Sequence, residues 1–229
     1  MEFLAYLLVF AVLAAGVKLI VSAYQAAQKR RAQLIAFAAD NGWTYTERDD
    51  SFTRCWKGKP FGHSIARATD VFQGQFGELR APFAAFTYTY TEVSTDSKGN
   101  TSSKDYSYEV CVLQLPKALP HLSVSNEGVF TKLARFLGSQ DIDFESDDFN
   151  RTYHIQSADT RFAYGVIHPQ MMEWLLGSGR MLAPWRIDNT FLISYTLGLL
   201  NTTRVLQKLN TATTLVEQIP QYVWDDFSH

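Results

Sequence analysis

The sequence predicts an α+β fold in which a single N-terminal transmembrane helix precedes a soluble domain with an antiparallel β-sheet and packed helices. Three observations predict it. Residues Phe3 to Val17 carry no polar group other than the Tyr6 hydroxyl. Residues Phe83 to Val93 alternate between two faces, as in a strand. Residues Thr202 to Gln218 place apolar side chains at helical spacing.

The N-terminal segment is long enough to span a bilayer. From Phe3 to Tyr24, at a rise of about 1.5 Å per residue, a helix measures about 33 Å. Lys18 lies near its end, where a long side chain can reach the headgroups. A secretory signal would need a basic start, and Glu2 stands there instead. We therefore expect residues 1–24 to form an uncleaved single-pass anchor.

Charge indicates the orientation of that anchor. Lys29, Arg30 and Arg31 follow it, whereas only Glu2 and the terminal amine precede it. The positive-inside rule then places the N-terminus outside the plasma (inner) membrane and the soluble domain in the cytoplasm. The same basic triplet is a candidate for contact with anionic headgroups, or it is a topology signal alone. Cys55 and Cys111 should be free thiols there, whereas the opposite topology would allow them to pair.

Residues 25–139 read as a helix followed by a β-rich subdomain. The helix should end at Asn41-Gly42, and a short strand should follow from Trp43 to Glu47. Strands 83–93 and 106–115 form a predicted hairpin whose tip, residues 94–105, has no apolar side chain. Pro116 and Pro120 should end the sheet, and a helix should run from about 126 to 137.

Residues 140–229 read as a second, α+β subdomain. A strand is expected over 153–156, with helices capped at Asp159 and opened by Pro169. Two strands, 185–187 and 191–195, should be joined by a turn at Asp188-Asn189. Asn201 should cap the last helix.

Several motifs of this second part resemble an uncharacterised bacterial family, of actinobacterial type and membrane-anchored, which contains a domain of unknown function. The motifs are Glu145-Ser146, Phe149-Asn150 and the Pro-x-x-Met-x-x-Leu-Leu pattern from Pro169 to Leu176. Gly42-Trp43-Thr44-Tyr45 and residues 220–226 fit the same group, and the resemblance is strongest over 141–176 and 220–226. It implies no activity, cofactor or catalytic residue. His168, where related sequences carry a hydroxyl residue before the proline, reads as a structural helix cap.

Composition and motifs argue against several functions. The formal net charge of −2 is unlike that of a dedicated nucleic-acid binder. Two cysteines cannot build a four-thiolate zinc site, and no phosphate-binding glycine loop occurs. The acidic run from Asp141 to Asp148 lacks the glycine and the final glutamate of a calcium loop. We predict no metal, no cofactor and no catalytic residues.

Two features remain as candidate chemistry. Cys55 lies beside Arg54 and Lys57, whose charges would lower a thiol pKa, whereas Cys111 lies in the middle of a strand and should be buried. Tyr88, Tyr90, Tyr106 and Tyr108 share one face of the hairpin and form either a partner surface or ordinary core.

These observations leave three hypotheses. The first is a membrane-tethered, cytoplasmic, non-enzymatic adaptor that binds a protein partner through Ser97, Lys98 and Asn100 of the hairpin tip and through Tyr88 and Tyr108. The second is a sensor or carrier of a small apolar ligand or lipid, suggested by the aromatic content of 14%. The third, a thiol-dependent enzyme using Cys55, has the least support.

Overall fold

The computed structural model describes residues 2–126 and 140–228, without the side chains of residues 2–5, 7–9, 11, 12 and 140. Its contacts divide the chain into two compact units, Met1–Gly42 and Trp43–His229. The predicted helix over 126–137 lies outside the described residues, apart from Asn126. The division falls between Gly42 and Trp43. Strands from both predicted subdomains, 25–139 and 140–229, pair within one sheet.

The first unit is one helix, α1 (Glu2–Asp40), which ends where the sequence predicts. The backbone N–H of Asn41 donates to the carbonyl of Phe37, and Gly42 adopts a left-handed φ of 67°. As predicted, the helix extends past Tyr24. It continues without a break through Gln25 and the basic triplet 29–31.

This helix corrects the prediction of a membrane anchor over 1–24. Among the described residues, no helix combines the length and the apolar character that crossing a bilayer requires. Lys18, Ser22 and Gln25 interrupt the part of α1 whose side chains are described. The predicted transmembrane segment, its orientation and the single-pass inner-membrane placement are therefore wrong on this finding. The membrane contact predicted for Lys29, Arg30 and Arg31 rested on that anchor.

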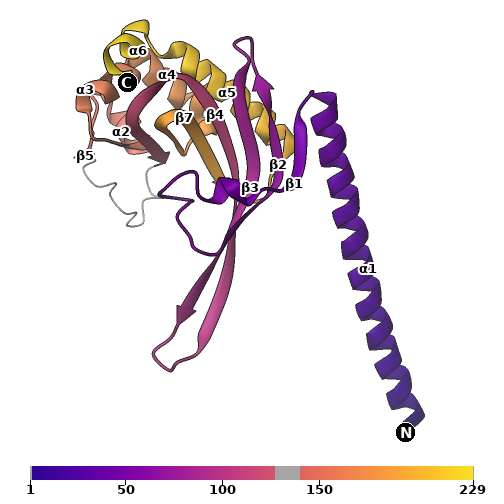
Figure 1. Cartoon of the computed structure of the whole chain (residues 1–229). Coiled ribbons are helices and arrows are strands. Elements are labelled where there is room, and N and C mark those ends of the chain that lie inside the picture. The colour runs from indigo at the N-terminus through magenta and orange to yellow at the C-terminus, as the bar shows by residue number, and fades with distance from the viewer. Residues whose placement is uncertain (1, 127–139, 229) are drawn as a thin grey trace. The chain divides into compact units, whose positions relative to one another are not determined.

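The second unit is built on an antiparallel sheet, shown in Figure 1. Seven strands of the described chain form it, in the order β1-β2-β3-β4-β6-β5, and β7 also pairs with β4. Their bounds are β1 (Thr44–Arg48), β2 (Ala66–Phe76), β3 (Ala81–Thr95), β4 (Thr101–Asn126), β5 (Gln140–Asp141), β6 (Tyr153–Ser157) and β7 (Trp185–Leu197).

The sheet's centre is β4, which is longer than the sequence predicts. It runs through Pro116 and Pro120, and its pairing with β7 shifts register between Gln114 and Leu122. Proline lacks an N–H, so here it interrupts the ladder without ending the strand. The predicted turn at Asp188-Asn189 is likewise an irregularity inside one strand, β7, where Asn189 has a φ of 57°.

Helices cover one face of this sheet, and a loop covers the other (Figure 1). The helices are α2 (Asp147–Thr152), α3 (Thr160–Val166), α4 (Pro169–Leu176), α5 (Thr202–Gln218) and α6 (Gln221–Phe227), with the 3₁₀ turn η2 (Ser178–Leu182). The predicted caps are confirmed, since Asp159, His168 and Asn201 each accept a hydrogen bond from a first-turn N–H. Residues 49–65, the covering segment, include the 3₁₀ turn η1 (Asp50–Thr53) and lie on the opposite face.

Glu109 links the sheet to α5. Its side chain is fully buried, and its carboxylate accepts hydrogen bonds from the backbone N–H of Asn201 at 2.7 Å and from Arg204 Nε at 3.2 Å. Lys208, also buried, lies 3.2 Å from the same carboxylate and donates to Thr196 Oγ1 of β7 at 2.9 Å. One carboxylate thus connects β4, β7 and the first turns of α5.

Replacing Glu109 with Ala should destabilise the fold by about 3–5 kcal/mol, because Lys208 would be left buried without its counter-charge. Urea unfolding followed by tryptophan fluorescence measures this. The matched control is Glu92→Ala, an exposed glutamate on β3, which should change stability by no more than about 0.5 kcal/mol. Equal effects of the two substitutions would show that the buried network contributes nothing specific.

Candidate functional site

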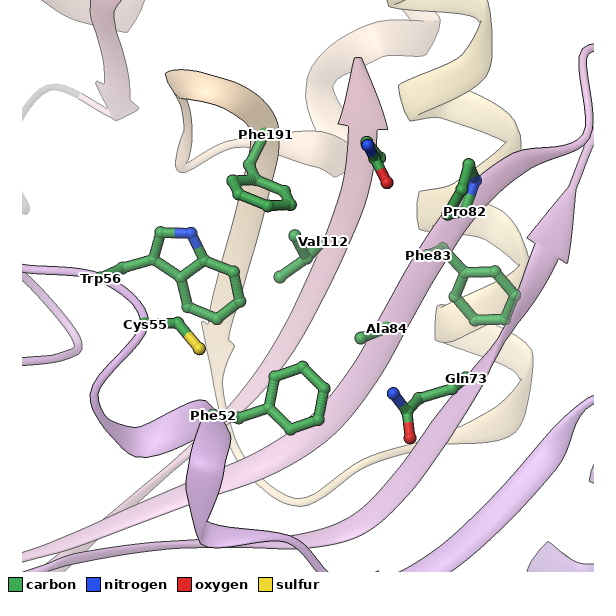
Figure 2. A pocket seen from close by; sticks show the side chains of 10 residues that line it. Phe52, Cys55, Trp56, Gln73, Pro82, Phe83, Ala84, Val112 and Phe191 are labelled. Carbon is green, nitrogen blue, oxygen red and sulfur yellow. The ribbon is translucent and has the colours of Figure 1, made fainter. Parts of the chain in front are cut away.

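An apolar cavity of about 420 Å³ lies where the covering segment leaves part of the sheet exposed. This volume falls within the range of about 300–1,000 Å³ that is typical of small-molecule sites. Its lining side chains come from β2, β3, β4, β7 and the covering segment, and Figure 2 shows them around the cavity. The lining residues are Phe52, Cys55, Trp56, Gln73, Pro82, Phe83, Ala84, Val112, Gln114 and Phe191.

The floor of the cavity follows from strand register. Gln73 of β2 pairs with Ala84 of β3, which pairs with Val112 of β4, so these three form one row across the sheet. Gln114, two residues beyond Val112 on the same face, pairs with Phe191 of β7. A small residue, Ala84, occupies the middle of the first row, which leaves room above it.

Aromatic rings form the wall beside that floor. The ring of Phe52 stacks on Trp56 at 6.3 Å between centroids and lies 5.0 Å from Phe86 of β3. Trp56 meets the edge of Phe191 at 5.5 Å. These contacts continue the core that lies under the covering segment, whose other members include Phe61 and Tyr88. The cavity is therefore the open end of a packed aromatic core.

Arg186 of β7 holds the covering segment in place. Its two terminal nitrogens donate to the backbone carbonyls of Lys57 and Lys59, each at 2.8 Å, and its guanidinium lies over the ring of Phe61. The side chain is only 7% exposed, and burial lowers its pKa while Asp188, at 3.6 Å, opposes that shift. A buried cation thus fixes the backbone of the segment that forms the cavity wall.

Cys55 is the thiol of this site, but its environment differs from the prediction. The side chain is exposed, and its Sγ donates to the carbonyl of Ser51 at 3.3 Å. Partial burial raises the Cys55 pKa, and the negative charge of Asp49 adds to the increase. The lowering expected from Arg54 and Lys57 is therefore wrong, and the site favours the neutral thiol over the nucleophilic thiolate.

Cys111 is buried in β4, as predicted. Burial is the main cause that raises its pKa to about 12. The two thiols lie in different surroundings, and the structure records both as free. Cys55 is thus the thiol that a reagent can reach.

The residues predicted as a partner surface fall into two groups. Tyr88 and Tyr108 are buried beneath the covering segment, which is the core alternative, and Tyr88 meets Phe61 at 5.0 Å. Ser97, Lys98 and Asn100 are exposed in the hairpin turn. That turn is shorter than the predicted tip, because β3 extends to Thr95 and β4 starts at Thr101.

Asp96 organises the hairpin turn. Its carboxylate accepts hydrogen bonds from the backbone N–H groups of Lys98 and Asn100 and from the side chain of Asn100. These bonds, the Asn100 side chain first, lower the Asp96 pKa. The turn projects with its ribbon beyond the rest of the sheet (Figure 1).

The acidic run 141–148 serves a structural role. Ser146 caps α2 by accepting from the N–H of Phe149, and the Asn150 side chain bonds both the N–H and the carbonyl of Phe144. Across the part of the chain that the structure describes, no group of three or more His, Cys, Asp or Glu residues could hold a metal ion.

Sequence reasoning did not identify most residues of the cavity. Phe52 and Trp56 lie far from Phe191 in the chain, and each of the three reads as an ordinary apolar residue. One signal was present at Gln114, which interrupts the otherwise apolar stretch 110–115, whereas Gln73 lies close to the polar residues Asp70 and Gln75. Without the strand register, nothing in the sequence places those two on one face.

Comparison with solved structures finds a similar fold. The chain resembles the crystal structure of the mycobacterial trehalose monomycolate transport factor A, with a TM-score of 0.59 and 10% sequence identity. The match covers 82% of this chain and 94% of the other. At this identity the likeness shows the fold alone. No family model and no curated protein matches the sequence, so the resemblance to an uncharacterised bacterial family stays a hypothesis.

Replacing Arg186 with Lys should loosen the covering segment, because a lysine cannot donate to two carbonyls in the fork geometry of arginine. Losing charged hydrogen bonds of about 1.5–3 kcal/mol should speed tryptic cleavage after Arg54 and Lys57 by roughly 10- to 100-fold. Mass spectrometry of a digestion time course measures the rates. Arg151→Lys, at an exposed position on α2, is the control and should leave them unchanged. Equal rates in the two variants would contradict the role assigned to Arg186.

Replacing Asp49 with Asn should lower the pH midpoint for alkylation of Cys55, because the carboxylate disfavours the thiolate. The midpoint should stay above that of a free thiol, since burial, the larger cause, remains. Asn can still cap η1, as Asp49 does by accepting from the N–H of Ser51. Iodoacetamide labelling across pH gives the midpoint. Cys111 serves as internal control, labelled only after unfolding, and an upward shift in Asp49→Asn would refute the electrostatic account.

Proposed function

We propose that this chain is a sensor or carrier that binds a small apolar ligand or the acyl part of a lipid, without transforming it chemically. The observation that carries this proposal is the apolar cavity beside the covering segment, with its aromatic wall and its exposed opening at Cys55, Pro82 and Gln114. Filling such a cavity removes apolar surface from water on both the ligand and the protein.

The energetics suit reversible binding. Each methylene group buried contributes about 0.8 kcal/mol, so a chain of several carbons can offset the cost of association. The wall of the cavity consists of packed aromatic rings, and its floor consists of hydrogen-bonded strands. A preformed site loses little conformational entropy when the ligand enters.

The structural similarity to a transport factor also supports the carrier proposal. That protein is named as a trehalose monomycolate transport factor. A related architecture would suit a related class of task here, namely holding an apolar molecule without reacting with it. The raised Cys55 pKa also argues for binding over thiol catalysis.

A protein-binding role for the hairpin turn is the weaker alternative. The exposed residues Ser97, Lys98 and Asn100 project beyond the sheet, but no partner chemistry is evident from them. The adaptor hypothesis also includes a membrane tether, and no helix among the described residues is long and apolar enough to cross a bilayer.

The proposal predicts that n-alkyl alcohols protect Cys55 from iodoacetamide, because Cys55 lines the cavity. The alcohol concentration that gives half-maximal protection should fall roughly fourfold per added methylene, because each buried methylene contributes about 0.8 kcal/mol. This decrease should level off at the chain length that fills the cavity. Full-length protein is used, with Cys111 as the unreactive internal thiol.

A variant with a smaller cavity sharpens the test. Ala84→Leu fills the space above the floor of the cavity, so protection should stop improving at a shorter alcohol chain length. Val93→Leu, at an exposed position on the same strand, should leave that chain length unchanged. Thermal unfolding checks that both variants are folded. Protection that is independent of chain length, or absent for every alcohol, would refute the proposal.

A further inference from the structure

The cavity combines an apolar interior with two side-chain amides and no charge. Gln73 and Gln114 are the carboxamides among its lining residues, and no lining residue in the described chain is Asp, Glu, Lys, Arg or His. Arg54 and Lys57 are neighbours of Cys55 in sequence, but neither lines the cavity. Its chemistry is therefore more specific than that of a general hydrophobic pocket.

Both carboxamides are free to bind a ligand. Within the part of the chain that the structure describes, neither Gln73 nor Gln114 has a side-chain hydrogen-bond partner. Gln73 is half-buried beside Ala84, and Gln114 is exposed. Figure 2 shows the Gln73 amide at the edge of the cavity, across from Phe52. Each amide offers both a donor and an acceptor.

We infer that the ligand is an uncharged amphiphile, a single acyl or alkyl chain with a hydroxyl or ester headgroup, whose headgroup hydrogen-bonds to Gln73 and Gln114 at the cavity rim. This rests on the proposed function and names its ligand class. A hydroxyl or ester exchanges hydrogen bonds with water for hydrogen bonds with an amide at little net cost.

Charge at the headgroup would oppose binding. A carboxylate, phosphate or ammonium that enters the cavity would give up hydration without meeting an opposite charge among the lining residues. Arg186 does not supply the missing cation, because its terminal nitrogens already donate to the carbonyls of Lys57 and Lys59. The site therefore selects against both signs of charge.

The test compares three amphiphiles with the same chain length: decanoylglycerol, decanoate and decyltrimethylammonium, each at neutral pH and below its micelle concentration. Protection of Cys55 in the full-length protein is the readout. Decanoylglycerol should protect at a concentration at least about tenfold lower than either ion, because each ion would be partly desolvated without a partner.

Gln114 gives a gain-of-function variant at an exposed position, where folding is least at risk. In Gln114→Lys, the decanoate concentration needed to protect Cys55 should fall about tenfold, because the lysine can pair with the carboxylate. In Gln114→Leu, the decanoylglycerol concentration needed should rise about fivefold, because a hydrogen bond is lost. Ser94→Lys, which adds the same charge on the exposed hairpin, should leave the ranking unchanged.

The outcomes distinguish the inference about the headgroup from the proposed binding function. Equal protection by all three compounds, or strongest protection by an ion, overturns the uncharged headgroup while leaving the proposed function standing. No protection by any of them, together with none by the alkyl alcohols, overturns both.

Discussion

The buried carboxylate of Glu109 is the constraint on which the rest of the fold depends. A charge with no exposed surface must be compensated where it lies, and here Lys208, Arg204 and the N–H of Asn201 do so together. Those partners belong to the start of α5, so the carboxylate fixes where that helix begins and against which strands it packs. Thr87 of β3 adds a further bond, accepting from the N–H of Leu200 at 2.9 Å. The helical face of the sheet is thereby closed by specific polar contacts.

The opposite face of the sheet is covered by a loop segment. No α-helix of residues 43–126 or 140–228 covers it, and the covering segment reaches only part of it, over Phe86 and Tyr88. Aromatic stacking and the bonds from Arg186 to two main-chain carbonyls hold that segment, so its position depends on one side chain of β7. Where the segment stops, the apolar rows of β2, β3 and β4 continue, and the cavity is the result. A site of this kind arises from incomplete coverage of a core and needs no dedicated motif.

Much of the local structure was predictable, because it depends on local chemistry. The alternation of 83–93 gave β3, and Asp159 and Asn201 each supplied an N-cap whose spacing alone places a helix start. The failures involve information that is not local. The apolar start of the chain suggested an anchor, but Lys18 and Ser22 interrupt it, and the described helices contain no membrane span. Arg54 and Lys57 suggested an activated thiol, but burial and Asp49 decide the Cys55 pKa. The cavity depends on register between four strands, which no single segment encodes.

The separation of charge between the two faces explains why the cavity suits an uncharged ligand. On the helical side, Glu109 and Lys208 neutralise one another in the interior. On the other side the buried cation, Arg186, donates to backbone carbonyls and lies over Phe61, so its charge serves the covering segment. None of these three buried charged residues lines the cavity, and the polar groups left at its rim are the amides of Gln73 and Gln114 and the neutral thiol of Cys55. The arrangements that stabilise the two faces therefore also determine which headgroup the cavity can accept.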